Sequence, residues 1–244
     1  MPDSPLYVGY LPVPPRHARF LRVFIPVALW GLVVINGAIL LAMREPGAAT
    51  WNTNSAVTLT GRIRDDGAPV LITDAGETVL IVRDSKLGAF GGPPREGPAE
   101  ISGFILERDG RRMIEITRAE SDRLASRLVD EQSPRAFPRT SPVTIRGEIL
   151  DAKCFLGAMK PGDGKAHKAC ATLCIRGGIP AAMRIRRADG AETLALIVGP
   201  GFAPFPASLE PFIADPIEID GAMFRIGDMD AIAVDPDSVR RISR

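Results

Sequence analysis

The sequence predicts a mainly β protein: one N-terminal transmembrane helix, then two small and similar β-barrel domains. Three observations lead to this prediction. A long uncharged apolar run lies near the N-terminus, short strand-like segments separated by turn residues fill the rest, and these segments recur in the same order in the two halves. All three cysteines lie in one segment of the second half, which makes that segment the candidate functional site.

The charge, the glycine and proline content and the cysteine count each limit what kind of protein this chain can be. Thirty Lys and Arg against 29 Asp and Glu leave almost no net charge, which argues against nucleic acid as a partner. The 24 Gly and 22 Pro fit short strands with many turns. Three cysteines cannot all pair within one chain, so the count implies a free thiol, an intermolecular bridge or a metal.

The apolar run covers residues 23–43, and residues 1–22 are interpreted as a cytoplasmic tail. At a rise of 1.5 Å per residue, its 21 uncharged residues span about 30 Å, the thickness of a hydrocarbon core. Pro26 is expected in the first helical turn, where its missing N–H does least harm. Asn36 is the one strongly polar residue of the run.

The charges beside the run predict its orientation. Arg16, Arg19 and Arg22 precede it, whereas Arg44 after it is offset by Glu45. The positive-inside rule therefore predicts that the N-terminus lies in the cytoplasm and the bulk of the chain in the periplasm. The membrane that the run is expected to cross is the bacterial inner membrane. A cleaved signal peptide is the alternative. Its apolar region is usually about 7–15 residues long, so the longer run favours an uncleaved anchor.

The first β domain is expected over residues 55–117. Its five predicted strands are rich in Val, Ile, Leu and Thr, and several alternate apolar with polar residues, as half-buried strands do. Turn residues such as Asp109 and Gly110 separate them. The strands are predicted at 57–63, 69–73, 78–82, 99–105 and 112–116.

The second β domain, residues 143–244, repeats this pattern. Its strands are predicted at 143–149, 182–187, 192–198, 216–224 and 231–235. Gly61 and Gly103 of the first domain correspond to Gly147 and Gly221, but the separations are 42 and 74 residues. The extra 32 residues match an insertion at 150–181. Five strands with glycine in the first and fourth favour OB-like barrels over a β-sandwich pair.

A helix and a proline-rich linker are expected between the domains, over residues 118–142. Thr117 and Glu120 have the spacing of a capping box. Leu124 and Leu128 then share one helical stripe, which predicts packing against the first barrel. Three prolines in 133–142 are typical of a stiff linker.

The cysteine segment contains Cys154, Cys170, Cys174 and His167, one of two histidines in the chain. A helix is predicted over 165–175, capped by Asp163 and ended by Gly177-Gly178. His167, Cys170 and Cys174 then share one face, and the turn at 161–164 folds Cys154 back onto it. These four residues are therefore predicted to form a metal or redox site.

Helix geometry leaves three arrangements open. His167 and Cys174 lie about 10.5 Å apart along the axis, which strains a single ion that takes both. In the first arrangement, Cys154 forms a disulfide with Cys170 or Cys174 and one thiol stays free. In the second, Cys154, Cys170 and either His167 or Cys174 bind copper, zinc or iron.

Met159 or Asp151 would complete the ligand shell of that metal site. The third arrangement, haem held by His167, ranks behind the others because no C-x-x-C-H motif is present. Basic residues also surround the segment, and they would favour thiolates if they lie near the sulfurs. A solvated basic surface is the alternative for these residues, which are Lys153, Lys160, Lys165, Lys168 and Arg176.

The segment resembles a motif of an uncharacterised family of membrane-anchored bacterial proteins. The match covers about 35 residues, with one departure: Ala181 stands where that family has a second proline. Membership implies that the Cys and His residues act together, and it implies no reaction. The matching positions are Gly147, Asp151, Lys153, Cys154, Gly157, Met159, Pro161, Gly162, Gly164, His167, Cys170, Ala171, Cys174, Ile175, Gly177, Gly178, Ile179 and Pro180.

An anchor followed by an exported small barrel also looks like the haem chaperone of cytochrome c maturation, although its haem-attaching histidine motif is not evident here. The leading hypothesis is a periplasm-facing accessory protein that serves another membrane or periplasmic redox protein as a subunit or maturation factor. The alternative is a non-catalytic interaction module whose insertion is stapled by one disulfide. Beyond His167 with Cys170 no nucleophile–base set is visible, so a binding protein is favoured over an enzyme.

Overall fold

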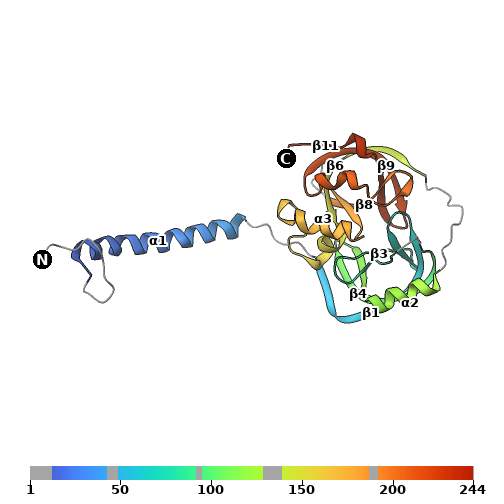
Figure 1. The fold of residues 1–244 in the computed structure, drawn as a ribbon, viewed down its shortest axis with the longest axis horizontal. Coiled ribbons are helices and arrows are strands. Elements are labelled where there is room, and N and C mark those ends of the chain that lie inside the picture. Colours follow the sequence, from blue (N-terminus) through green and yellow to red (C-terminus); the bar gives the residue numbers. More distant parts are fainter. Residues whose placement is uncertain (1–12, 43–48, 92–94, 129–138, 187–191, 244) are drawn as a thin grey trace. The chain divides into compact units, whose positions relative to one another are not determined.

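The computed structural model describes residues 13–42, 49–91, 95–128, 139–186 and 192–243. It divides into two compact units, Met1–Glu45 and Pro46–Arg244, which we describe separately. The first unit contains helix α1 (Pro15–Ala42), and the second contains every described strand (Figure 1).

Helix α1 is long and apolar enough to cross a membrane, with a mean hydropathy of 2.3 in its most apolar window. It begins eight residues before the predicted span, so residues 15–22 are helical. Pro15 suits the first helical position, and the arginines that follow are good helix formers. Pro26 therefore lies inside the helix and not in its first turn. Asn36 donates to Leu32 O at 2.7 Å, so its amide is satisfied within its own helix.

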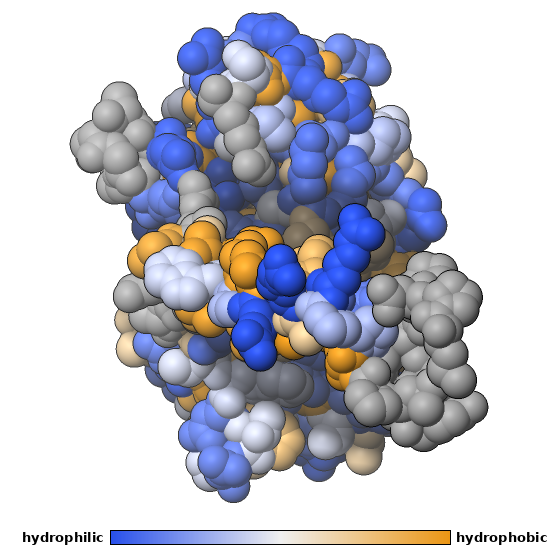
Figure 2. Space-filling view, turned by 90° about the vertical axis from the view of Figure 1, so that its left-hand side faces the viewer, coloured by the Kyte–Doolittle hydropathy of each residue, from blue (hydrophilic) through white to orange (hydrophobic). Residues whose placement is uncertain are grey.

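Figure 2 shows a mostly hydrophilic surface with hydrophobic residues among the hydrophilic ones. Most of the exposed large hydrophobic side chains among the described residues belong to α1, and none of its most apolar window is buried. The helix presents apolar side chains all round, as a membrane-spanning or signal helix does.

The first barrel consists of five strands that close in the order β1-β2-β3-β5-β4. Strands β3 and β5 pair in parallel, and β1 closes the barrel against β4. This arrangement is consistent with a small OB-like barrel, as predicted. The strands are β1 (Thr50–Asp65), β2 (Pro69–Thr73), β3 (Thr78–Arg83), β4 (Gly97–Arg108) and β5 (Arg111–Ile116).

Strand β1 begins well before the predicted 57–63. Its first residues include Asn52 and Asn54, which have low strand propensity, and they are solvent-exposed. Residues 50–52 belong to the strand because β4 is long enough to pair with them: Trp51 lies opposite Leu106, and Asn52 opposite Ile105. An irregularity in the register separates these pairs from the next one, Val57 with Gly103. Tertiary pairing overrides local propensity here.

The second barrel closes in the equivalent order β6-β7-β8-β10-β9, again with one parallel pair, β8 with β10. The predicted duplication is therefore confirmed at the level of topology. A short strand, β11 (Arg240–Arg241), adds to β9 and was not predicted. The barrel strands are β6 (Ser141–Asp151), β7 (Ala181–Arg186), β8 (Glu192–Val198), β9 (Pro216–Ile226) and β10 (Met229–Val234).

The matched glycines occupy equivalent places in the two barrels. A Cβ on Gly61 would lie 2.2 Å from Ile72 O, and one on Gly147 would lie 2.3 Å from Arg184 O. In both cases the second strand of the barrel crosses the first too closely for any side chain. The matching sequence positions therefore reflect one steric requirement that is met twice.

Helix α2 (Arg118–Arg127) begins as predicted, because the Thr117 hydroxyl accepts from Glu120 N at 3.2 Å. The reciprocal half of the capping box is replaced, since Glu120 instead accepts from Ser102 N. Leu124 and Leu128 enter the core of the first barrel, which confirms the predicted packing. The predicted linker lies largely outside the described residues, and its last two residues begin β6.

The two barrels share a hydrophobic core. One cluster of buried residues combines side chains of both barrels with Cys154, Phe155 and Cys174 of the insertion. Side chains of the first barrel can therefore reach the insertion of the second. The members from the strands include Val70, Leu80, Leu106 and Met113 of the first barrel and Leu150, Leu196 and Phe224 of the second.

Candidate metal and thiol site

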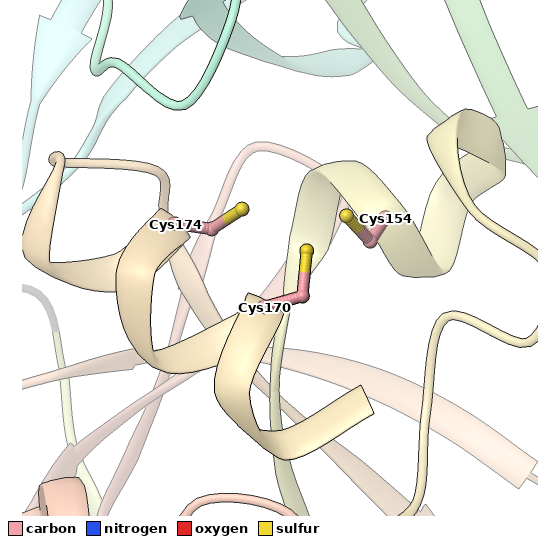
Figure 3. A group of neighbouring side chains, drawn as sticks. All are labelled: Cys154, Cys170 and Cys174. Carbon is pink, nitrogen blue, oxygen red and sulfur yellow. The ribbon is translucent and has the colours of Figure 1, made fainter. Parts of the chain in front are cut away.

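The insertion between β6 and β7 brings the three cysteine sulfurs together. Cys154 opens the helical turn η1 (Cys154–Ala158), while Cys170 and Cys174 lie one turn apart on α3 (Lys168–Arg176). Their sulfurs lie within 4.8 Å of one another and point toward a common point (Figure 3). Cys154 and Cys174 are buried, Cys170 is half-buried, and all three are free thiols.

The turn before α3 folds back onto Cys154, as predicted. A Cβ on Gly162 would lie 2.4 Å from Cys154 O, so only glycine permits this approach. The helix itself differs from the prediction: residues 165–167 form a 3-10 turn, η2 (Lys165–His167), and α3 follows it. Asp163 does not cap either element; its carboxylate pairs with Arg184 instead.

His167 belongs to a second group of donors. The Asp151 carboxylate, fully buried at the end of β6, lies 2.9 Å from His167 Nε2 and accepts from Cys154 N at 2.8 Å. Donor atoms of Asp151, His167 and Cys154 lie within 4.8 Å of one another. The four predicted residues therefore form two groups that share Cys154, and His167 is not grouped with Cys170 or Cys174.

The Cys154 and Cys174 thiols shift each other's pKa in opposite directions. The hydrogen bond from the Cys154 thiol to Cys174 raises the pKa of Cys154 far above its usual range, and burial and Asp151 add to this. The same hydrogen bond is the largest cause that lowers the pKa of Cys174, from 9.0 to about 7, with Lys86 acting in the same direction. Near neutral pH, Cys174 is therefore the more ionised member of the pair, and Cys154 stays a thiol.

This proton distribution predicts an early thiolate titration. In the metal-free protein, the ultraviolet absorbance of thiolate should rise through about pH 7, where an ordinary thiol with a pKa of 9.0 is only about 1% ionised. The direction follows because a lowered pKa populates the anion at lower pH. The matched variant Cys174→Ser should lose this early step. A wild-type curve that begins to rise only near pH 8 would contradict the prediction.

Lys86 contacts the cysteine sulfurs, and the sequence did not predict this. Its ammonium donates to Cys170 Sγ at 2.8 Å and lies 3.5 Å from Cys174 Sγ, although it is 84 residues from Cys170 in the chain. The hydrogen bond with Cys170 raises the pKa of Lys86 above its usual range. No local signal marks Lys86, which lies in an ordinary polar turn after β3 of the first barrel.

The motif residues hold the turn that carries Lys86. A Cβ on Gly177 would lie 1.7 Å from Lys86 O, and Gly88 N donates to Gly177 O at 2.8 Å. The buried Lys153 ammonium donates to Arg83 O and Ser85 O at 3.0 and 2.6 Å. These glycine and lysine positions fix Lys86 beside the sulfurs.

Lys153 was predicted as a supporting residue of the site, and the structure gives it a different partner. Its ammonium lies 3.3 Å from the Glu115 carboxylate and clamps the Lys86 turn. The other predicted cations with described partners form ion pairs as well, Lys168 with Asp215 and Arg176 with Glu210. Among the described residues, the cation bonded to the sulfurs is therefore Lys86.

Met159 is 47% exposed and follows η1, so its position does not favour it as a buried ligand. Three sulfurs with metal bonds of about 2.3 Å would lie about 4 Å apart, close to their present spacing. The arrangement suits either an ion held by three thiolates or thiol exchange between Cys174 and Cys154. No protein-family model, curated protein or solved structure matches this chain.

Proposed function

We propose that this chain is a membrane-anchored protein that binds a thiophilic transition-metal ion through Cys154, Cys170 and Cys174. The observation that carries the proposal is the convergence of three free sulfurs from two elements within 4.8 Å. Thiolates at this spacing need only small shifts to share one ion. A bound ion would link η1 to α3 within the insertion, and it would serve there as a redox or transfer centre.

The ligand set favours copper(I) over zinc and iron. Three thiolates complete a low-coordinate shell for a soft monovalent ion, whereas zinc takes four ligands in its structural sites. The neighbouring oxygen and nitrogen donors, Asp151 and His167, already hydrogen-bond to each other. Asp151 also holds Cys154 N, so this pair orients Cys154 rather than adding a fourth ligand.

The proposed location is the periplasmic side of a bacterial inner membrane. Helix α1 is longer than the apolar region of a signal peptide, which supports an uncleaved anchor. The arginines at its N-terminal end support a cytoplasmic N-terminus. Together with the resemblance of the cysteine segment to membrane-anchored bacterial proteins, this supports an accessory role, as a subunit or maturation factor of a redox complex.

A second candidate function is thiol–disulfide exchange, which is favoured by the lowered pKa of Cys174 and by the closeness of the Cys154 thiol. The Cys174 thiolate would attack a disulfide of a partner protein, break its S–S bond and release one partner thiolate. Cys154 would then lose its proton and displace the second partner sulfur. The products are a Cys154–Cys174 disulfide and a partner dithiol, so two electrons pass to the partner.

One experiment separates these functions. The full chain is extracted from membranes in detergent without chelator, and its metal content, intact mass and free thiols are measured. Metal binding predicts about one copper per chain and thiols that become reactive only after the metal is removed. A reversible loss of two mass units without metal supports thiol exchange. A disulfide that is not reduced reversibly, together with the absence of metal, would contradict both functions. The alternative would then be a non-catalytic interaction module whose insertion is held by that disulfide.

A further inference from the structure

The Pro46–Arg244 unit exposes few large hydrophobic side chains. Among its described residues they are Trp51, Leu87, Met159 and Leu173, with exposed fractions of 40, 40, 47 and 55%. Single exposed hydrophobic residues are normal, but here three of the four belong to the insertion or to the turn that carries Lys86, and the fourth, Trp51, lies on β1 beside η1.

Two of the four are sequence neighbours of residues that make the site. Leu173 precedes Cys174 on α3 and lies three residues after the half-buried Cys170, so it flanks the exposed side of that sulfur. Leu87 follows Lys86, whose ammonium contacts both Cys170 and Cys174. Two exposed leucines therefore stand next in the chain to Lys86 and Cys174, the residues that meet at the thiol cluster.

The other two border η1, which begins with Cys154. Met159 follows η1 and donates its N–H to Cys154 O. Trp51 of β1 runs beside the same turn, because a Cβ on Gly157 would lie 2.4 Å from Thr50 O and 3.3 Å from Trp51 N. We call these four residues, Trp51, Leu87, Met159 and Leu173, the apolar rim.

Basic residues accompany the apolar rim. Lys86 is exposed apart from its contact with the sulfurs, and Lys160 and Lys165 are exposed in the turn between Met159 and α3. No carboxylate is bonded to any of these three ammonium groups among the described contacts. Large apolar side chains beside lysines are the composition of a lipid-interface surface, where the side chains enter the headgroup region and the lysines meet phosphates.

The chain keeps this surface within reach of a bilayer. Trp51 lies nine residues after Ala42, the last residue of α1, so the extended chain between them spans at most about 30 Å. Tryptophan is also the residue most characteristic of the membrane–water interface. A short tether raises the local lipid concentration and lets a modest surface bind.

We infer that the apolar rim and its lysines dock on the anionic lipid headgroups of the membrane that α1 spans, with the thiol cluster facing that membrane. The inference rests on the proposed membrane anchor and not on metal binding. It places Cys170, the half-buried cysteine, on the side where a membrane-embedded partner would exchange metal or electrons with the site.

The chain offers a direct probe, because Trp51 and Trp30 are its only tryptophans and Trp30 lies in α1. The full chain with Trp30→Phe is reconstituted in vesicles that contain anionic lipid and lipids brominated at defined depths. Docking predicts that Trp51 loses most of its emission, chiefly to the shallow bromines, and that high salt reverses part of the loss. Unquenched emission would overturn the inference.

A charge-matched pair of variants controls for tethering alone. Met159→Asp with Leu173→Asp should restore Trp51 emission, because carboxylates are repelled from the interface. Thr58→Asp with Ser126→Asp adds the same charge on exposed positions of the first barrel and should leave the quenching unchanged. Equal quenching in both pairs would refute docking through the rim. Quenching seen only when a membrane protein partner is co-reconstituted would also overturn the lipid assignment.

Discussion

Replacing Cys174 by serine is expected to lower copper(I) affinity by about a hundredfold or more, since loss of even an outer-shell partner of a metal ligand costs about 10–100-fold. The serine hydroxyl is a poor ligand for a soft ion, and only two sulfurs remain within bonding distance of a common point. Competition with a copper(I) chelator of known affinity gives the dissociation constant directly.

Two matched variants sharpen this prediction. Ala169→Ser adds a hydroxyl at an exposed position of α3, next to Cys170, and should leave the affinity unchanged. Asp151→Asn keeps the side-chain size but weakens the contacts to Cys154 N and His167, so it should have an intermediate effect. If Cys174→Ser binds copper(I) as tightly as Ala169→Ser does, the three-sulfur site is wrong.

The fold was largely predictable because its signals are local. Short runs of Val, Ile and Leu marked β2, β3 and β8 with almost their observed bounds. The glycine pairs revealed the duplication because one strand-crossing geometry imposes glycine in each barrel. The errors arose where tertiary contacts decide: the first residues of β1 are a strand only because β4 pairs with them.

The clustering of the three cysteines was predictable from the sequence, and the surroundings of the cluster were not. Helical spacing correctly separated His167 from Cys174, because their distance along the axis is independent of tertiary structure. Asp163 suited a cap by sequence, yet the Arg184 guanidinium offers it a stronger partner. Lys86 could not be found at all, since it reaches the sulfurs only through the packing of two barrels that share a core.

Lys153→Met is expected to destabilise the Pro46–Arg244 unit by about 3–5 kcal/mol, the cost of leaving one partner of a buried ion pair without the other. The side chains of Lys153 and Glu115 are only 5% and 11% exposed. Methionine fills similar space but donates nothing to Arg83 O or Ser85 O, so the Glu115 carboxylate and two carbonyls lose their partner. Urea denaturation followed by circular dichroism measures the loss.

The control for this prediction is Lys168→Met. Its ion pair with Asp215 is more exposed, with 37% of the lysine side chain accessible, so the expected loss is at most about 1 kcal/mol. The double variant Lys153→Met with Glu115→Gln should be more stable than Lys153→Met alone, because no buried charge is left unpaired. Equal stabilities of the Lys153 and Lys168 variants would show that the contacts of Lys153 with Glu115, Arg83 O and Ser85 O do not stabilise the fold. The position of Lys86 beside the sulfurs would then depend on other contacts.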